Sequence, residues 1–471
     1  MSFFSPTFAA FFLLTIVLYF LSPHRLRVPV LLTASVIFYM SFIPEYIVFI
    51  LGLIITDFFA AHLIERSSTP ASRRAWLLLS LAMNFGFMAS FKYAPAILGK
   101  PLGEIPLGLS FHTFQSTAYV IEVYRRRQAA EQSFLVFALY VMFFPQLAAG
   151  PIERPQVLLH QFREYHKFDY ARFVSGLQQV AWGLFQKYVL ANHFAAAVNP
   201  VYTDPSSHSG PAALLAALAF PFQILCDFAG YSDIAIGSAS ILGFRLSRNF
   251  NRPFQADSMA EYWKRWHISL SSWMRDYIFF PLCGHRPAMS RVCGAIIATF
   301  VLNGLWHGAR WNYLISGLLH GSYRVVELLA GRALSRQDWP LPPFLEAPVR
   351  VARTILVFLL MAFAFMFFRG DSLTNTLHVI SRIGTAWDGI SSFAAFTHSF
   401  QSVEIGPARL LLLLSLVLLV HAVNFAQAYG SLRARIAAQP FWFRWSFYYA
   451  AAIALLGFGP RAAQPFIYFQ F

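Results

Sequence analysis

The stretch 302–309 reads LNGLWHGA, and it decides how the fold is interpreted because it joins two apolar runs, 293–306 and 308–330. The second run carries another histidine, His320. Ionisable side chains at membrane depth are costly, so they usually face a cavity or a reaction path. His307, inside the stretch, is therefore the first candidate for chemistry.

The composition of the chain is that of a membrane protein. Of its 471 residues, 57% are hydrophobic and only 12% are charged, whereas soluble domains carry about 25% charged residues. The formal net charge of +15 would suggest nucleic acid in a soluble protein. Here the basic residues lie in short segments between apolar runs, which favours membrane topology and anionic lipid over nucleic acid.

The apolar runs predict an all-α polytopic membrane protein. A helix needs about 20 residues to cross the hydrocarbon core, so the shorter runs are expected to be re-entrant or broken where they line protein or water. No internal repeat or soluble domain interrupts the chain, so we predict one transmembrane domain over 1–471. The predicted spans are 5–22, 28–43, 46–64, 75–93, 106–124, 133–149, 211–228, 293–306, 308–330, 351–368, 406–425 and 442–459, with weaker candidates at 172–192 and 230–243.

The placement of Lys and Arg predicts the orientation of the chain. Basic clusters at 25–27, 66–74 and 125–127 follow predicted spans and alternate with poorly basic loops. The positive-inside rule places these clusters in the cytoplasm and the N-terminus outside. Counting back from the basic pair at 433–435 places the C-terminus outside as well, and the basic segment 245–291 in the cytoplasm.

Several common chemistries lack their motifs in this chain. The three cysteines form no CxxC pair and lie in or beside apolar runs, so they are expected to be packing residues. The spacing of His267, His307 and His320 matches neither a helical i, i+4 pair nor a zinc motif, so we expect no metal. The absence of G-x-S-x-G and of G-x-x-x-x-G-K-S/T argues against a self-contained serine hydrolase or a nucleotide-driven pump.

The longest polar and aromatic block spans 249–277 and has two interpretations. Trp263 and Trp266 accompany Lys264 and Arg265 on one short stretch. The block can be an interfacial amphipathic helix, anchored by tryptophans and by cations whose stems lie along apolar surface. It can also be a cytoplasmic anion site for a phosphate-bearing donor. Residue types alone favour the anchor because tryptophan belts are common at membrane interfaces.

Asp227 and Asp233 are two carboxylates in an otherwise apolar region. Such groups need partners or protonation at membrane depth, and a pair of acids can serve acid–base catalysis. They can equally pair with arginines and hold irregular intramembrane backbone together, and we favour this structural role. The candidate arginine partners are Arg252, Arg265 and Arg275.

His307 and Tyr468 each have a structural and a functional interpretation. A lone histidine on an apolar helix is more often a core residue, but the adjacent Gly308 leaves room for a substrate chain. A neutral imidazole there can act as general base on a hydroxyl. The end of the chain, 464–471, is aromatic instead of polar. Composition favours a membrane-interface anchor for this segment, and a phenol in an apolar slot is the alternative.

Five segments carry a family resemblance: Pro106–Gln115, Phe144–Ile152, Asp227–Asp233, Trp263–Tyr277 and Leu305–Ala309. Each is weak alone, but together they resemble the membrane-bound O-acyltransferase family, and more closely its bacterial branch that acetylates exopolysaccharides such as alginate and cellulose. The motifs of the single predicted domain are concentrated at about 106–330. Two positions depart from the family pattern, His112 where many relatives have Tyr and Glu122 where many have Asp.

The resemblance implies a fold and a set of functional residues. The fold is a multi-helix bundle with re-entrant helices around a central tunnel. The family's catalytic histidine corresponds to His307 and its second characteristic histidine to His267. The aromatic end of the chain is similar to a signature proposed for an acyl-carrying tyrosine, which makes Tyr468 the third catalytic candidate. The residues expected to contact the donor are Lys264, Arg265, Arg275 and Trp306.

These implications combine into an acetyl relay at the bacterial inner membrane, with both termini in the periplasm. Acetyl-CoA is the expected donor on the cytoplasmic side. The acetyl group passes through His307 and Tyr468 to a periplasmic partner of the SGNH, serine-hydrolase-like type, which O-acetylates an exopolysaccharide. Other expected partners are subunits of exopolysaccharide synthesis or secretion and membrane lipid, and nucleic acid is not expected.

Two other functions are compatible with the sequence. One is a transporter of an acyl donor or glycan that performs no chemistry. Its path would use charged residues at membrane depth: Asp57, Lys187, Asp227 and Asp233. The other is acyl transfer from an acyl-carrier protein, as in the teichoic-acid branch of the family. The basic cytoplasmic surface suits an acidic carrier protein as well as it suits CoA.

Overall fold

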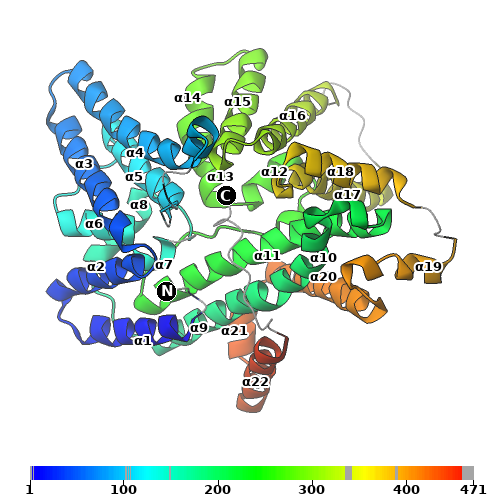
Figure 1. The fold of residues 1–471 in the computed structure, drawn as a ribbon. Helices are drawn as coiled ribbons and strands as arrows, with labels where there is room; N and C mark the ends of the chain where they lie inside the picture. Colours follow the sequence, from blue (N-terminus) through cyan, green and yellow to red (C-terminus); the bar gives the residue numbers. More distant parts are fainter. Residues whose placement is uncertain are drawn as a thin grey trace. The chain divides into compact units, whose positions relative to one another are not determined.

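The computed structural model describes residues 3, 5–100, 103, 105–106, 108–147, 150–334, 342–387 and 391–458. All regular secondary structure in these ranges is helical (Figure 1). Within them, six helices are long and apolar enough to cross a membrane: Pro44–Arg66, Pro70–Leu98, Gly210–Leu242, Met289–His307, Pro343–Arg369 and Pro407–Ala428. The all-α polytopic membrane fold predicted from the sequence is confirmed.

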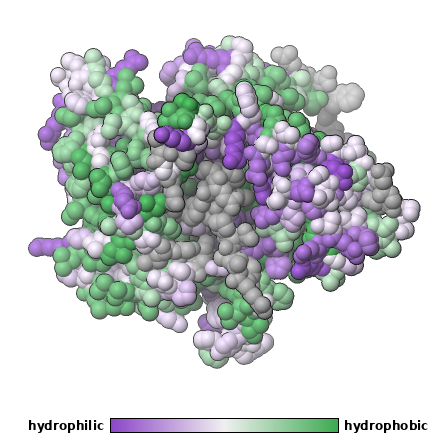
Figure 2. All heavy atoms as spheres, viewed as in Figure 1, coloured by the Kyte–Doolittle hydropathy of each residue, from purple (hydrophilic) through white to green (hydrophobic). Residues whose placement is uncertain are grey.

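Hydrophobic residues cover broad areas of the visible surface (Figure 2). On α20 (Pro407–Ala428), the side chains of Leu411, Leu414 and Leu418 are 66%, 55% and 70% exposed. Exposed apolar area of this extent is unfavourable in water and marks contact with another apolar phase. The surface therefore agrees with the composition, since both indicate lipid as the solvent.

The first compact unit comprises Met1–Gly183 and Tyr231–Asn249. Two of its helices begin at a side-chain cap: Ser5 accepts a hydrogen bond from the N–H of Phe8 at the start of α1, and Thr69 accepts one from the N–H of Ser72 at the start of α4. The helices are α1 (Pro6–Leu21), α2 (His24–Met40), α3 (Ile47–Arg66), α4 (Pro70–Leu98), α5 (Leu109–Tyr124), α6 (Phe134–Met142), α7 (Phe144–Leu147), α8 (Pro155–Leu158) and most of α9 (Tyr170–Phe185).

A buried carboxylate ties three helices of this unit together. Asp57 on α3 is fully buried and accepts hydrogen bonds from Ser80 and Asn84 on α4 and from Ser116 on α5. A buried charge is costly unless its oxygens find hydrogen-bond donors, and these three side chains provide them. Asp57 is explained by this packing role between α3, α4 and α5.

The second compact unit comprises Leu184–Gly230 and Phe250–Phe471. α11 contributes residues to both units. The helices of the second unit are α10 (Asn192–Thr203), α11 (Gly210–Leu242), α12 (Met259–Arg265), α13 (Ile268–Met274), α14 (Phe280–Cys283), α15 (Met289–His307), α16 (Trp311–Leu334), α17 (Pro343–Arg369), α18 (Leu373–Thr385), α19 (Phe393–His398), α20, α21 (Leu432–Ala437) and α22 (Phe441–Phe458).

α15 and α16 form a tight helical hairpin because glycines remove side chains from their contact. A Cβ atom on Gly304 would lie 2.2 Å from the carbonyl oxygen of Tyr313. A Cβ atom on Gly317 would lie 2.4 Å from the carbonyl oxygen of Phe300. Backbone approach this close leaves no space for a side chain, so both positions require glycine.

Two predicted span boundaries are wrong. The weak span at 230–243 is not separate, because α11 continues to Leu242 without a break at Gly230. Glycine inside a helix costs only about 1 kcal/mol relative to alanine, and the burial of 78% of the most apolar window of α11 outweighs it. The predicted span at 308–330 begins only at Trp311, because α15 ends at His307.

The predicted packing role of several polar and sulfur-bearing residues is supported. Asp227 on α11 forms an ion pair with Lys187, and both side chains are almost fully buried. Lys187 was not among the partners expected for this carboxylate from the sequence. In the first unit, Asp233 accepts a hydrogen bond from Gln179 at 2.8 Å. Cys226 is a buried free thiol, as expected for a packing residue.

Candidate active site

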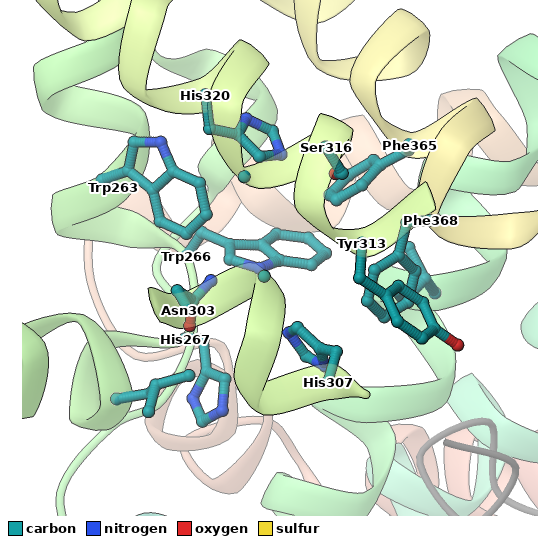
Figure 3. Close-up of a pocket in the computed structure, with 14 residues that line it drawn as sticks. Trp263, Trp266, His267, Asn303, His307, Tyr313, Ser316, His320, Phe365 and Phe368 are labelled. Atoms are coloured by element: carbon teal, nitrogen blue, oxygen red, sulfur yellow. The ribbon is translucent and has the colours of Figure 1, made fainter. Parts of the chain in front are cut away.

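A pocket of about 480 Å³, including its open mouth, lies within the second unit (Figure 3). It is lined by side chains from α11, α12, α13, α15, α16 and α17 and from the junction between α12 and α13. None of the described residues that line it is Asp, Glu, Lys or Arg. Its polar side chains are His267, Asn303, His307, Ser316 and His320. Its aromatic side chains are Trp263, Trp266, Tyr313, Phe365 and Phe368.

Helical spacing explains why the α15–α16 hairpin supplies most of the polar groups. Asn303 and His307 are four residues apart on α15, so they share one face of the helix. Tyr313, Ser316 and His320 follow the spacing 3, 4 and 7 on α16, which also defines a single face. The close contact at the hairpin glycines brings the two faces to the same pocket.

His307 is the last residue of α15 and is only 8% exposed. Its ring lies 4.3 Å from the ring of Trp306, 4.8 Å from that of Phe368 and 6.0 Å from that of Tyr313, measured between centroids. Gly308 follows in a conformation with φ 150°, and a Cβ there would lie 3.2 Å from the Tyr313 ring. The imidazole is thus held among aromatic rings. Trp306, a predicted donor contact, is buried beside it and does not line the pocket.

His267 joins α12 to α13 in a left-handed conformation with φ 40° and ψ 55°. This conformation is uncommon outside glycine and is found at functional sites, where the surrounding structure enforces it. The ring packs edge-on against Phe228 at 4.7 Å, and only 2% of the residue is exposed. Burial lowers the pKa of His267 to about 3, so its imidazole is neutral at physiological pH.

The interfacial-anchor interpretation of the tryptophans is wrong for Trp266. Only 3% of this residue is exposed, and its ring lies 5.3 Å from that of Phe365. Trp263 also lines the pocket and packs edge-on against His320 at 5.0 Å. Tertiary packing turns these two rings into pocket walls, which residue types alone cannot indicate.

The predicted basic donor contacts lie outside the lining of the pocket. Arg265 pairs with Glu261 one turn earlier on α12, with 3.0 Å between Nε and Oε1. Arg275 is exposed and pairs with the adjacent Asp276 at 2.8 Å. Lys264 is exposed. Their contact with a donor stays a prediction.

Glu327 on α16 fixes the start of α12. Its two carboxylate oxygens accept hydrogen bonds from the backbone N–H groups of Met259 at 2.6 Å and Ala260 at 3.1 Å. Arg324 forms an ion pair with the same carboxylate. Because the first N–H groups of a helix have no partner within the helix, a carboxylate there both satisfies and orients them. α12 carries Trp263 into the pocket, so Glu327 acts on the pocket through the helix.

The structure brings together two of the three predicted catalytic residues, His267 and His307, in one pocket. Tyr468 lies outside the described residues. His320 was expected from the sequence only as a possible metal ligand, and Asn303 and Ser316 were not expected at the site. The spacing along α15 and α16 was a usable signal for these residues, but the contact between the helices was needed to combine it.

Residues 107–368 match the MBOAT, membrane-bound O-acyltransferase family, and this segment is more than half of the 471 residues. The chain belongs to the membrane-bound O-acyltransferase family. It is therefore an O-acyltransferase of the membrane. The matched segment contains every described residue that lines the pocket, from Ile224 to Phe368.

Relatives of this acyltransferase are named for alginate, peptidoglycan and teichoic acid. A probable alginate O-acetylase from Azotobacter vinelandii is 34% identical over 377 residues, which cover 76% of this chain and 72% of the relative. A peptidoglycan O-acetyltransferase from Helicobacter pylori is 30% identical over 387 residues, with 74% and 72% coverage. A teichoic acid D-alanyltransferase from Bacillus subtilis is 31% identical over 229 residues, with 45% and 56% coverage. The resemblance predicted from the sequence is confirmed.

Proposed function

We propose that this O-acyltransferase transfers an acetyl group from acetyl-CoA to a hydroxyl acceptor at His307. The observation that carries the proposal is the character of the pocket, in which three histidines lie among aromatic rings and none of the described lining residues is Asp, Glu, Lys or Arg. A small, uncharged acyl group suits this lining, since a buried charge without a partner is strongly disfavoured. The names of the acetyl-transferring relatives support the same choice.

His307 acts as the general base in this mechanism. The neutral imidazole takes the proton of the acceptor hydroxyl as its oxygen attacks the thioester carbonyl carbon. A carbon–oxygen bond forms, the carbon–sulfur bond breaks, and the proton passes to the sulfur, which leaves as the thiol of CoA. His267, neutral and lining the same pocket, positions the thioester by hydrogen bonding.

Tyr468 is the proposed first acceptor. A phenol has a pKa near 10, so it needs a base to attack at neutral pH, and its ester remains reactive enough to pass the acetyl group on. In the proposed topology the enzyme lies in the bacterial inner membrane with both termini periplasmic. Acetyl-CoA approaches from the cytoplasm, where Lys264 and Arg275 contact its phosphates. A periplasmic partner of the serine-hydrolase type then acetylates an exopolysaccharide of the alginate or cellulose type.

A carrier-protein donor is the second candidate, because one relative is named for D-alanyl transfer to teichoic acid. A D-alanyl group carries an ammonium, which would need a carboxylate partner inside the pocket. The lining provides none among the described residues. The pocket therefore favours acetyl over D-alanyl, whichever thioester carries it.

Non-enzymatic transport is less well supported than acyl transfer. Three residues of its expected path are engaged in buried interactions: Asp57 accepts from three hydrogen-bond donors, and Asp227 and Lys187 pair with each other. Such groups tie helices together and do not offer a continuous polar path. Membership of an acyltransferase family points the same way.

The test uses the full-length protein purified in detergent with acetyl-CoA that carries a radiolabel in the acetyl group. We expect release of free CoA and transfer of label to the protein, both abolished in His307→Ala. Size-exclusion chromatography checks that the variant remains folded. Equal turnover by His307→Ala would refute the catalytic assignment. Turnover with an acetylated carrier protein but not with acetyl-CoA would show that the donor is the carrier protein. The proposed role of His307 would then still hold.

A further inference from the structure

Three polar atoms around the pocket have no hydrogen-bond partner in the part of the chain that the structure describes. They are Nε1 of Trp263, Oδ1 of Asn303 and Nδ1 of His320. They come from α12, α15 and α16, and all three residues line the same pocket. Buried polar atoms are nearly always paired in folded proteins. Three unpaired atoms from three helices around one pocket therefore indicate a ligand that supplies the missing partners.

His320 is the most enclosed of the three residues, with 4% of it exposed. Its ring packs edge-on against Trp263 at 5.0 Å and lies 6.0 Å from the ring of Phe365. It follows Tyr313 by two turns on one face of α16, which corresponds to about 10 Å along the helix axis. In the view of Figure 3, the Trp266 ring lies between His320 and His307. The unpaired nitrogen of His320 is thus displaced along the pocket from His307.

The chemistry of the three atoms limits what can pair with them. The indole N–H of Trp263 only donates, the amide oxygen of Asn303 only accepts, and Nδ1 of His320 does either according to its tautomer. A hydrocarbon chain would pair with none of them. An acetyl group has a carbonyl oxygen but no N–H. A secondary amide offers one acceptor and one donor together, which matches this set.

We propose that Trp263, Asn303 and His320 form a subsite for a secondary amide in the arm of the acyl donor. The inference rests on the proposed thioester donor, because a pantetheine-type arm carries its first amide two methylene groups from the thioester sulfur. The amide oxygen accepts from Trp263, and the amide N–H donates to Asn303 or His320. The subsite binds a part of the donor that does not react. Its loss therefore raises KM and leaves kcat nearly unchanged.

Two small donors of equal length separate this subsite from the reaction itself. S-acetyl-N-acetylcysteamine has one amide two methylene groups from sulfur, and S-pentyl thioacetate replaces that amide by hydrocarbon. Release of free thiol is measured for the full-length wild type and for His320→Phe, which keeps a ring but removes both ring nitrogens. Tyr323→Phe on the same helix is the matched control, because Tyr323 does not line the pocket.

We expect the wild type and Tyr323→Phe to favour the amide donor in kcat/KM. We expect His320→Phe to reduce that preference about five- to tenfold, which is the effect of one lost hydrogen bond. The reduction should come from a higher KM for the amide donor, with KM for the hydrocarbon donor unchanged. An equal preference in the wild type and His320→Phe would overturn the subsite. Asn303→Leu should reduce the preference in the same way, which guards against a specific effect of the introduced phenylalanine.

A failure of the proposed acyl transfer can be distinguished from a failure of the amide subsite. If the wild type released thiol from neither donor nor from acetyl-CoA, the acyl transfer itself would be refuted. The subsite is then tested by the binding of pantetheine, measured by calorimetry. Weaker binding to His320→Phe and Asn303→Leu than to wild type would support an amide subsite without catalysis, and unchanged binding would overturn it.

Discussion

Gly304 on α15 and Gly317 on α16 face one another across the hairpin, and a Cβ atom built on either would lie 3.4 Å from the Cα atom of the other. This contact sets the separation of the two helices that supply His307 and His320. Because interior packing is dense and transmits small displacements, the separation also sets the width of the pocket.

Gly317→Ala is expected to open the hairpin and reduce activity. The new Cβ would lie 2.4 Å from the carbonyl oxygen of Phe300, so the helices must move apart. Overpacking of this kind costs about 1–3 kcal/mol, and a displaced base lowers acetyl transfer about 100-fold. The measurements are thermal unfolding in detergent and CoA release.

Gly331→Ala is the matched control for this substitution. Gly331 lies on the same helix, and a Cβ atom added there would have no described neighbour within 4 Å. Alanine there should leave activity unchanged and raise stability by up to about 1 kcal/mol. Equal effects of the two alanine substitutions would contradict a role for the helix contact.

Glu327→Gln is expected to loosen the start of α12. The amide keeps one acceptor oxygen but loses the charge that two backbone N–H groups share. We expect a loss of about 1–2 kcal/mol in stability and a higher KM for the donor, because α12 carries Trp263. Arg324→Met removes the ion pair and keeps both backbone contacts, so its effect should be smaller. A larger effect of Arg324→Met would show that the ion pair dominates.

Because the buried His267 is neutral, we expect the free energy of unfolding to fall in acid. Unfolded histidine has a pKa near 6.5, and burial lowers the folded pKa to about 3. The unfolded state therefore binds a proton that the folded state excludes, so the stabilising contribution is present above pH 6.5 and is lost as the pH falls towards 3. Between pH 6.5 and 5.0 the free energy of unfolding is expected to fall by about 2 kcal/mol from this group.

His267→Asn isolates this effect, because asparagine tolerates the left-handed conformation and does not titrate. Thermal unfolding of the wild type and the variant is compared from pH 5.0 to 8.0, so that contributions of other groups cancel in the difference. The wild-type melting temperature should fall more steeply below pH 6.5. Parallel curves would argue against a neutral buried imidazole.

Tyr468→Phe tests the acyl carrier and removes a single oxygen. We expect the radiolabel from acetyl-CoA to disappear from the protein, and onward transfer to be lost, with membrane insertion retained. Tyr449→Phe is the control, since Tyr449 on α22 is 63% exposed. Hydroxylamine should release the label from the wild type, as expected for an ester. Full labelling of Tyr468→Phe would exclude the carrier role.

The sequence by itself determined the solvent of this protein, its helical class and its family. Apolar runs and sparse charge were enough for the solvent and the helical class, and the five motif segments together were enough for the family, because all of these are local features of the sequence. They also singled out His267 and His307, which the structure places in one pocket. The break expected near Gly230 was wrong because burial of α11 outweighs the cost of one glycine.

Only the tertiary structure decided which residues share the pocket with the two histidines. The glycine contact joins residues thirteen positions apart, and the chain reverses between them at Gly308. The packing of the helices also buries Trp266, which the sequence suggested as a membrane anchor, in the wall of the pocket. It places His320 beside Trp263. Such relationships depend on distances between helices. Helical periodicity specifies the face on which a side chain lies but not the partner that this face meets.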